Sequence, residues 1–393
     1  MNISGELSVG LMEHRDAVEV ELQGSFVDAA GRQVEPGRHR FTSEVELKPT
    51  NPAADSFALN DVTIGIGFHW ERNERQAFRG GMRILKRDGL TVVNDVPLEE
   101  YVSSVISSEM SAGCPIELLK AHAVISRSWL CAPQTGSAAN VSMREGDEII
   151  RWYGREAHRD FDVCADDHCQ RYQGITKDHS PSVSEAVKAT AREVLQYDGR
   201  VCDARFYKCC GGLTDEYRTA WDDREVPYLI SLPDTDENGR VYCDTKDKTL
   251  LAQILPGFDQ ETQDFYHWTV TYSGEEIRDL LIARLEEDLG VVTELEPLQR
   301  GPSGRIIRLR IAGEKKQLII GKELEIRRAL SRSHLYSSAF DVERSESKFV
   351  LRGKGWGHGV GLCQIGAAVM ASRGKDYQEI LRHYYPGTVT GQL

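Results

Sequence analysis

Apolar and polar residues alternate along most of the first 95 positions of the chain. The stretches AVEVELQGSF (residues 17–26) and DVTIGIGFHW (residues 61–70) show the period of two that is typical of half-buried strands. Clusters of Gly, Pro and Asn separate such stretches, as in VEPGRHR and KPTNPAAD. The pattern predicts an N-terminal β-rich region over residues 1–95.

From Leu98 onward the period changes to that of a helix. Tyr101, Val105 and Glu109 follow one another at intervals of four residues, so one helix places all three on a single face. The Gly113-Cys114-Pro115 break predicts the end of this helix.

A second helix is predicted directly after that break. Its stripe of Leu118, His122, Ile125 and Trp129 again has helical spacing. Two helices that are joined by a short loop pack as a hairpin.

Later segments mix both periods. Strand-like stretches are VLQY, ARFYK, HWTVTY, RIIRLRIAG and KQLIIG, and helical stretches are residues 182–192, EEIRDLLIARLEEDLG and a short helix that ends at HYYPG. The sequence therefore predicts an α+β fold with mixed or antiparallel strands. Four regions are expected: residues 1–95, a core of residues 96–235 with the hairpin and a His/Cys loop, an α+β lobe of residues 236–345, and a glycine-rich segment of residues 346–393 that completes the core.

Composition narrows the class of partner. The 48 Lys and Arg residues stand against 61 Asp and Glu residues, which gives a net charge of −13 and argues against a nucleic-acid partner. No apolar run reaches the length of a membrane-spanning helix. The N-terminal sequence MNISGELSVGLMEHRDAVEV does not show the basic and then apolar pattern of a secretory signal.

Glu109 occupies an unusual position because it continues an apolar stripe. A carboxylate on that face points toward the core or into a cleft, and loss of hydration favours the protonated form that a general acid needs. The alternative is a buried structural glutamate that is held by a partner such as Arg127 or His122. Helical spacing alone leaves both interpretations open.

Four potential metal ligands, His158, Cys164, His168 and Cys169, lie within twelve residues. Two imidazoles and two thiolates are a sufficient set for tetrahedral Zn²⁺. Four protein ligands close the coordination shell, so such a zinc would be structural. The alternative is a polar surface loop with unrelated cysteines.

A second group of cysteines comprises Cys202, Cys209, Cys210 and Cys243. Cys209 and Cys210 are adjacent, and neighbouring residues of a strand point to opposite sides. We therefore expect core thiols or latent disulfide partners here.

Three long segments together resemble the SpoIID/LytB family. PLEEYVSSVISSEM with ELLKAHAVISRSW is similar to the family's helical hairpin. GRVCDARFYKCCGGLTDEY, before TAWDD and PYLISLPD, is similar to its Gly-Gly-x-Thr segment, and GKGWGHGVGLCQIGAAVMASRG with ILRHYYPGT to its C-terminal signature. These segments span residues 97 to 388 in the family's order.

The resemblance implies a lytic transglycosylase that cuts peptidoglycan glycan strands between N-acetylmuramic acid and N-acetylglucosamine and leaves a 1,6-anhydro sugar. A long substrate cleft is expected, and the family's catalytic glutamate falls on Glu109. Because the C6 hydroxyl of the sugar is the nucleophile, one carboxylate can act first as acid and then as base. The resemblance also implies a structural zinc site in the His/Cys loop, with His168 its least certain ligand.

In the glycine-rich tail, GWGHGVG lacks the Lys-Ser/Thr ending and the spacing of nucleotide-binding loops. By resemblance this tail lines the glycan groove, where Trp356 would stack on a sugar ring and His358 and Gln364 would form hydrogen bonds. Arg127, Tyr207 and Lys208 are further candidates for steadying the glutamate or holding the substrate. The alternative is a tight turn whose His and Gln satisfy buried backbone groups.

Two other functions stay open at this point. One is a non-catalytic module that binds peptidoglycan and stimulates another wall enzyme, and the other is a zinc-dependent hydrolase. The expected partners are glycan strands without stem peptides, by analogy with the family, and this substrate implies the cell envelope.

Overall fold

The computed structural model describes residues 6–67, 71–133, 141–154, 158–177, 180–257, 259–262, 264–345 and 348–393. The chain divides into two compact units, and each is discontinuous in sequence. Unit 1 comprises Met1–Arg127 and Ala157–Arg192, and unit 2 comprises Ser128–Glu156 and Glu193–Leu393. Both units combine helices with sheets, so the predicted α+β fold is confirmed.

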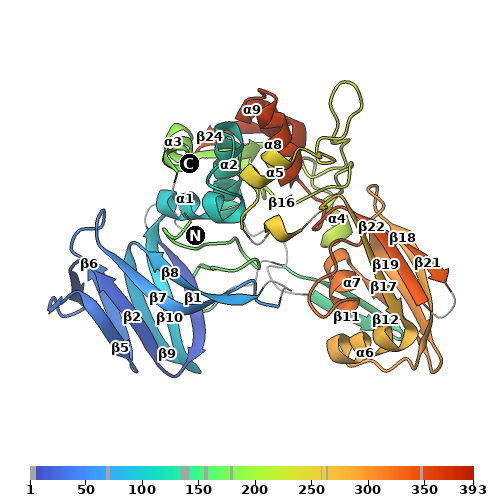
Figure 1. Cartoon of the computed structure of the whole chain (residues 1–393), viewed down its shortest axis with the longest axis horizontal. Coiled ribbons are helices and arrows are strands. Elements are labelled where there is room, and N and C mark those ends of the chain that lie inside the picture. Colours follow the sequence, from blue (N-terminus) through green and yellow to red (C-terminus); the bar gives the residue numbers. More distant parts are fainter. Residues whose placement is uncertain are drawn as a thin grey trace. The chain divides into compact units, whose positions relative to one another are not determined.

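Unit 1 contains two sheets, whose strands are drawn in blue and cyan in Figure 1 except for the short green β13. One has seven strands in the order β13-β1-β10-β9-β6-β3-β4, and the other has four strands in the order β5-β2-β7-β8. Their bounds are β1 Glu6–Arg15, β2 Val18–Gln23, β3 Phe26–Asp28, β4 Gln33–Val34, β5 Gly37–Phe41, β6 Val45–Pro49, β7 Ser56–Ile64, β8 Arg72–Phe78, β9 Gly81–Arg87, β10 Gly89–Pro97 and β13 Val163–Cys164. Alternation of buried and exposed positions along strands such as β2 matches the predicted period.

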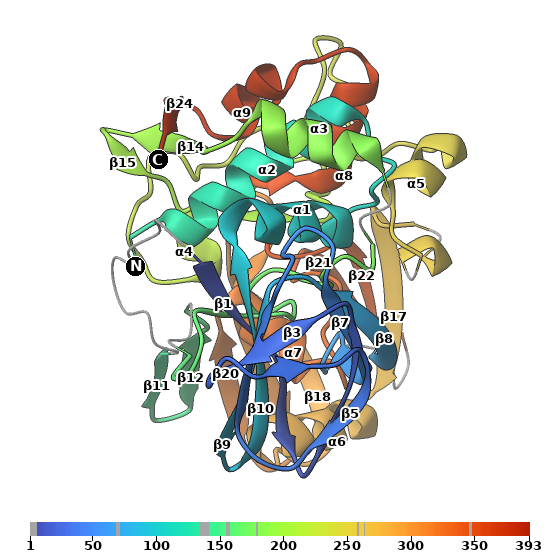
Figure 2. The same ribbon diagram turned by 90° about the vertical axis from the view of Figure 1, so that its left-hand side faces the viewer.

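The helical hairpin follows β10 without a loop. Helix α1 (Leu98–Glu109) contacts β10, β1 and α3 (Pro181–Ala189), and α2 (Ile116–Cys131) follows it after six residues. Figure 2 shows the three helices lying near one another. All four members of the predicted α2 stripe are buried, from Leu118 to Trp129. The sequence placed both helices correctly, and α1 ends at Glu109, slightly before the predicted break.

Unit 2 is built from four smaller sheets. Their orders are β11-β12-β20-β19-β18, β15-β14-β24, β16-β23 and β17-β22-β21. The strands are β11 Val141–Glu145, β12 Glu148–Trp152, β14 Glu193–Tyr197, β15 Arg200–Val201, β16 Phe206–Tyr207, β17 His267–Ser273, β18 Val292–Arg300, β19 Ile306–Gly313, β20 Gln317–Gly321, β21 Phe340–Ser345, β22 Lys348–Lys354, β23 Leu362–Cys363 and β24 Val389–Gln392.

The helices of unit 2 are α4 Tyr217–Ala220, α5 Lys248–Ile254, α6 Gly274–Leu285, α7 Glu323–Ala329, α8 Gln364–Ser372 and α9 Tyr377–Tyr384. Helices α6 and α7 contact each other and the strands of the five-stranded sheet. Apolar residues of these elements form one core, with Ile277, Leu309 and Ile326 fully buried. The second pair, α8 and α9, packs beside the short strand β23.

The division into units differs from the four regions expected from the sequence. Residues 1–95 do not stand alone, because β10 continues into α1 and β13 pairs in parallel with β1. Residues 96–235 are shared between both units, whereas residues 236–393 lie wholly in unit 2. Strand pairing over long sequence separations is the reason, because local pattern does not reveal it.

Within the part of the chain that the structure describes, every helix is too short or too polar to cross a lipid bilayer.

Candidate functional site

Glu109 is the last residue of α1, and its side chain is buried. Only 8% of the residue is exposed, whereas Tyr101 and Val105 on the same stripe are fully buried. The backbone N–H of Arg171 donates a hydrogen bond of 3.0 Å to Oε1 of Glu109. The helical phase that singled out Glu109 therefore places its carboxylate at the packed side of α1, with one oxygen fixed by a backbone donor.

The segment that includes Arg171 runs along the same face of α1. Tyr101 Oη donates to Gln170 Oε1 at 3.2 Å, and the N–H of Gln173 donates to Ser104 Oγ at 3.1 Å. Together with the bond to Glu109, these contacts tie residues 170–173 to the length of the helix. The position of the glutamate thus depends on a segment that directly follows the His/Cys loop.

Arg127 is fully buried and pairs with Glu99 of the first turn of α1. Its Nε lies 3.0 Å from Oε1, and its Nη2 lies 2.7 Å from Oε2. This two-pronged ion pair holds α1 against α2, because a guanidinium matches a carboxylate at two points. His122, the other residue considered as a partner of Glu109, has Nδ1 3.1 Å from Ser126 Oγ. A role for Arg127 in substrate binding stays a prediction.

A hollow of about 310 Å³ lies beside the start of α1 in unit 1. Glu100, Ser103, Ser104 and Tyr172 are among the residues that line it, and Glu109 is not. Burial raises the pKa of Glu100, against the opposing effect of the Arg79 guanidinium. Sequence reasoning assigned Glu100 only to the helix dipole and missed this hollow.

The four residues of the His/Cys loop come together in unit 1. The ligand atoms of His158, Cys164, His168 and Cys169 all lie within 4.8 Å of one another. His158 Nε2 is 3.3 Å from Cys169 Sγ, and His168 Nδ1 is 3.5 Å from Cys169 Sγ and 3.8 Å from Cys164 Sγ. The nitrogen-to-sulfur edge of a zinc tetrahedron is about 3.6 Å, from bond lengths of about 2.0 and 2.3 Å. The donor set and its spacing therefore fit Zn²⁺.

The thiol chemistry of this cluster fits the same ion. Hydrogen bonding with Cys169 lowers the pKa of the Cys164 thiol to about 2, with further lowering by His158 and His168 and an opposing effect of burial. A low thiol pKa favours the thiolate, which is the form that binds metals.

The loop is anchored at two points of unit 1, the turn after β7 and strand β1. The Asp166 carboxylate accepts hydrogen bonds from the N–H groups of Gly65 and Ile66, at 3.0 and 3.1 Å. The Asp162 carboxylate accepts bonds from the N–H and hydroxyl of Ser8, at 2.9 and 2.7 Å. The ligands are thus presented by a loop that is fixed at its base.

Unit 2 brings together the predicted tail residues and the segment around Lys208. Strand β16 pairs in parallel with β23, and Cys209 forms a two-way backbone bridge with Trp356. The N–H of Ile365 donates to the Lys208 carbonyl at 3.1 Å. Five of the predicted substrate-binding residues therefore share one neighbourhood: Tyr207, Lys208, Trp356, His358 and Gln364. Glu109 belongs to unit 1 and these five residues to unit 2.

The His358 ring lies between two aromatic rings, with centroids 5.3 Å from Tyr207 and 5.0 Å from Trp221. Burial lowers its pKa well below the ordinary value, and the guanidinium groups of Arg205 and Arg305 lower it further. The ring is therefore neutral at neutral pH. Its Nδ1 accepts a 3.1 Å bond from the Val360 N–H, which leaves the proton on Nε2.

Tyr207 carries a buried hydroxyl for which the described residues offer no hydrogen-bond partner. Burial raises the pKa of this phenol well above its ordinary value, so the hydroxyl keeps its proton. A buried donor without a partner costs free energy, and a bound ligand can satisfy it. The hydroxyl oxygen is closed off from solvent, so a ligand reaches it only if neighbouring groups move.

The other tail residues have partners within the protein. Lys208 Nζ forms a buried ion pair of 2.8 Å with Asp259. The Trp356 ring lies 4.5 Å from Tyr336 and 4.7 Å from Phe265, measured between ring centroids. Gln364 is 2% exposed at the start of α8. These contacts show how the residues are positioned, and their roles in substrate binding stay predictions.

The glycines of the tail make room for the protein's own groups. Gly359 has φ +84°, and a Cβ there would lie 2.5 Å from the guanidinium carbon of Arg305. Arg305 is fully buried and donates from Nε to the Gly357 carbonyl at 3.1 Å and from Nη1 to the Cys210 carbonyl at 3.2 Å. This arginine joins the tail to the segment after β16, and sequence reasoning missed it.

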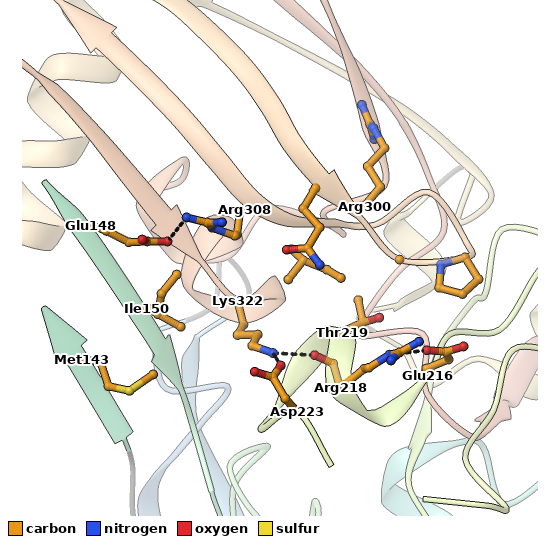
Figure 3. A pocket seen from close by; sticks show the side chains of 14 residues that line it. Met143, Glu148, Ile150, Glu216, Arg218, Thr219, Asp223, Arg300, Arg308 and Lys322 are labelled. Atoms are coloured by element: carbon orange, nitrogen blue, oxygen red, sulfur yellow. Dashed lines mark hydrogen bonds and ion pairs between the residues drawn. The ribbon is translucent and has the colours of Figure 1, made fainter. Parts of the chain in front are cut away.

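A hollow of about 560 Å³ lies elsewhere in unit 2, between β12, β19 and α4. Figure 3 shows that its cations face carboxylates: Lys322 Nζ is 2.6 Å from Asp223, and Arg308 is 2.5 Å from Glu148. The lining has one more cation than carboxylate, because Arg300 pairs with Asp341 outside the hollow. It includes none of the residues that the sequence singled out.

The second cysteine group is buried, as expected for core thiols, but its geometry differs in one respect from the prediction. All nine cysteines of the chain are free thiols, and Cys209 and Cys210 both hydrogen-bond with Cys243 and Cys363. The expectation that the two neighbours point to opposite sides is wrong, because β16 ends at Tyr207 and the strand alternation does not extend to them. Asp234 and Cys363 join Cys210 and Cys243 in one cluster.

Comparison with known proteins places this arrangement in a family. A family model described as "Stage II sporulation protein" matches residues 86–197, and a domain of unknown function (DUF8618) matches residues 215–361. An uncharacterized protein of Brachyspira hyodysenteriae is 30% identical over 311 residues, which cover 78% of this chain and 70% of that protein. Stage II sporulation protein D of Bacillus amyloliquefaciens is 27% identical over 301 residues, 75% of this chain and 74% of that protein. The amidase enhancer of Bacillus subtilis is 25% identical over 307 residues, 73% of this chain and 40% of the enhancer.

These relatives define a class of proteins with a role related to the bacterial cell wall. Within that class, the chain belongs to the SpoIID family. The resemblance seen in the three sequence segments is thereby confirmed.

Proposed function

We propose that this protein is a peptidoglycan lytic transglycosylase with Glu109 as its single acid and base. The observation that carries the proposal is the buried Glu109 carboxylate at the end of α1, with one oxygen held by the Arg171 N–H. A carboxylate on an apolar stripe needs a reason to be there, since buried charge is costly. Acid–base chemistry on a sugar chain gives one.

The reaction needs one carboxyl group and no water. Glu109 in its acid form donates a proton to the oxygen between N-acetylmuramic acid and N-acetylglucosamine, and the C1–O4 bond breaks. The C6 hydroxyl of the muramic acid then bonds to C1, and the Glu109 carboxylate takes the proton from that hydroxyl. The products are a 1,6-anhydro end and a free 4-hydroxyl, and Glu109 returns to its acid form.

The tail of unit 2 supplies the groups for sugar recognition in this proposal. Tyr207 carries a buried hydroxyl without a described partner, whereas the ring N–H of neutral His358 is already bonded to the Phe206 backbone. Hydroxyl and acetamido groups of sugars both accept hydrogen bonds from a neutral donor such as the Tyr207 hydroxyl. Trp356 is half-buried, and its indole is the kind of ring on which sugars stack.

We further propose a structural zinc at His158, Cys164, His168 and Cys169. With all four coordination positions taken by protein, the ion has no place for a reactive water, which disfavours a zinc hydrolase. Its role is to shape the loop before Arg171, whose N–H holds Glu109. Chelation should therefore lower stability more than it lowers the rate per folded molecule.

Product analysis tests the chemistry. Purified glycan strands without stem peptides are digested, and the products are identified by mass spectrometry. We expect anhydro-muramyl ends, whereas hydrolysis would leave reducing ends. Glu109→Gln should reduce product formation by about 100-fold or more, the range for loss of a general acid. The matched control is Glu100→Gln on the same helix, which should keep activity.

A second candidate function follows from the relative named amidase enhancer. In that case the protein binds peptidoglycan and stimulates another enzyme without cutting the glycan. The same assay distinguishes the transglycosylase from the binding module. A binding module yields no anhydro product even from the wild-type protein. Binding of glycan strands by wild type and Glu109→Gln alike, with no product from wild type, would favour this second function.

A further inference from the structure

A second cluster of potential metal ligands lies in unit 2. It is distant from the His/Cys loop in sequence and differs from it in the types of ligand. Its members are Cys210, Asp234, Cys243 and Cys363, and their ligand atoms all lie within 4.8 Å of one another. Each residue is at most 3% exposed. Three thiols and a carboxylate thus converge in the interior of one unit.

Backbone donors point at the sulfurs of this cluster. The N–H of Gly212 lies 3.2 Å from Cys210 Sγ, and the N–H of Cys210 lies 3.3 Å from Cys363 Sγ. A third N–H, from Gly366 in the first turn of α8, lies 3.4 Å from Cys363 Sγ. Sulfur accepts such bonds best as a thiolate, so the backbone is arranged to stabilise the charged form.

The Asp234 carboxylate is oriented by contacts at both of its oxygens. Oδ1 accepts a 2.7 Å hydrogen bond from Tyr384 Oη, with the His383 ring 3.5 Å away, and Oδ2 lies 3.1 Å from Cys210 Sγ. A Cβ at Gly366 would lie 2.5 Å from Oδ2, so only glycine leaves room for the carboxylate. This is the arrangement of a metal-binding carboxylate, whose free oxygen is held by an outer hydrogen bond.

Neither an apolar core nor a disulfide explains all four residues. Cys210 and Cys243 have their sulfurs 3.2 Å apart, but a disulfide between them would leave the Cys363 thiol and the buried Asp234 carboxylate unused. The sulfur-to-sulfur edge of a zinc tetrahedron is about 3.8 Å, so a small expansion of the cluster admits the ion.

We propose that Cys210, Cys243, Cys363 and Asp234 form a second, buried tetrahedral site for a thiophilic divalent cation, with Zn²⁺ as the first choice. On binding, the three thiols release their protons to solvent, and Asp234 binds as the carboxylate. The closed set of four protein ligands makes the ion structural. It joins the segment after Lys208 to the start of α8, and thereby fixes the tail independently of the role of Glu109.

Metal counting in variants of the full chain tests the site. The double variant Cys164→Ser/Cys169→Ser removes the His/Cys loop site, is stripped with chelator, reloaded with zinc chloride and dialysed. We expect one zinc per chain by mass spectrometry of the metal. Adding Asp234→Asn or Cys243→Ser to this variant should remove that zinc, whereas Cys202→Ala, another buried cysteine of unit 2 outside the cluster, should keep it.

Cobalt provides a readout that requires no substitution in the buried cluster itself. The double variant loaded with Co²⁺ should show thiolate-to-cobalt charge-transfer absorption and the visible bands of a tetrahedral ion. A double variant that is folded by circular dichroism but holds no zinc and gives no such spectrum would overturn the proposal. A disulfide between Cys210 and Cys243 in the freshly purified chain, found by mass spectrometry after alkylation without reductant, would overturn it as well.

Discussion

The two ligand clusters of this protein differ in how the chain assembles them. The cluster of His158, Cys164, His168 and Cys169 is contained in twelve residues of a partly exposed loop. In the buried cluster, Cys210 contacts Cys363 across 153 positions of sequence. Bringing distant segments together costs more chain entropy than closing a short loop. The first cluster can therefore form from its own loop, whereas the second requires that unit 2 is folded.

The two clusters also differ in the groups that hold them in place. The loop cluster is held by charged anchors, Asp162 and Asp166, that bond to strand β1 and to the turn after β7. The buried cluster is held by backbone N–H groups and by the Tyr384 hydroxyl. We therefore expect the loop cluster to govern local order and the buried cluster to govern the stability of a whole unit.

The largest effect is expected for Cys243→Ser in the buried cluster. It removes one ligand and leaves the Asp234 carboxylate buried without its cation, which costs about 3–5 kcal/mol of unfolding free energy. Denaturant unfolding followed by near-ultraviolet circular dichroism measures this loss. A change no larger than that of the loop variant below would contradict the difference between the clusters.

Cys169→Ser in the loop should have a smaller and more local effect. We expect a loss of about 1–3 kcal/mol, because only the loop and its anchors lose a ligand. Hydrogen exchange should become faster in residues 158–177 and stay unchanged in unit 2. Faster exchange throughout unit 2 would show that the loop cluster is not local.

Acid should weaken unit 2 through a half-buried histidine, His334, that belongs to neither cluster. Burial, with the nearby Arg327 guanidinium, lowers the pKa of His334 to about 3. Between about pH 6.5 and pH 3 the unfolded chain takes up a proton at this residue and the folded chain does not, so stability falls as pH falls. The slope is up to about 1.4 kcal/mol per pH unit for one such group. His334→Gln should flatten the dependence of the denaturation midpoint on pH. An unchanged slope would mean that other residues cause the pH dependence.

The smallest effect is expected for Cys202→Ala. This cysteine is 1% exposed in unit 2 but is not one of the four clustered ligands. Loss of one buried sulfur should cost about 1 kcal/mol, with no change in bound metal. A loss as large as that of Cys243→Ser would mean that burial alone, without coordination, explains the cluster.

Features with local signals were predictable from the sequence. The phase of Glu109 follows from Tyr101 and Val105, and the grouping of His158, Cys164, His168 and Cys169 follows from their lying within twelve residues. Asp234, Cys363 and Arg305 were not predictable in their roles, because each acts through contacts between segments far apart in sequence. The same reason explains why the boundaries of the two units were missed.

The discontinuity of unit 1 affects the folding of this protein during synthesis and its sensitivity to proteolysis. Arg171, whose N–H holds Glu109, follows that glutamate by 62 positions and lies beyond an excursion of the chain into unit 2. A ribosome that has released only the first 127 residues has released the glutamate without its anchor. Proteolysis within residues 128–156 would break the covalent connection between two parts of unit 1, and a fragment that stops there would carry the acid in an incomplete setting.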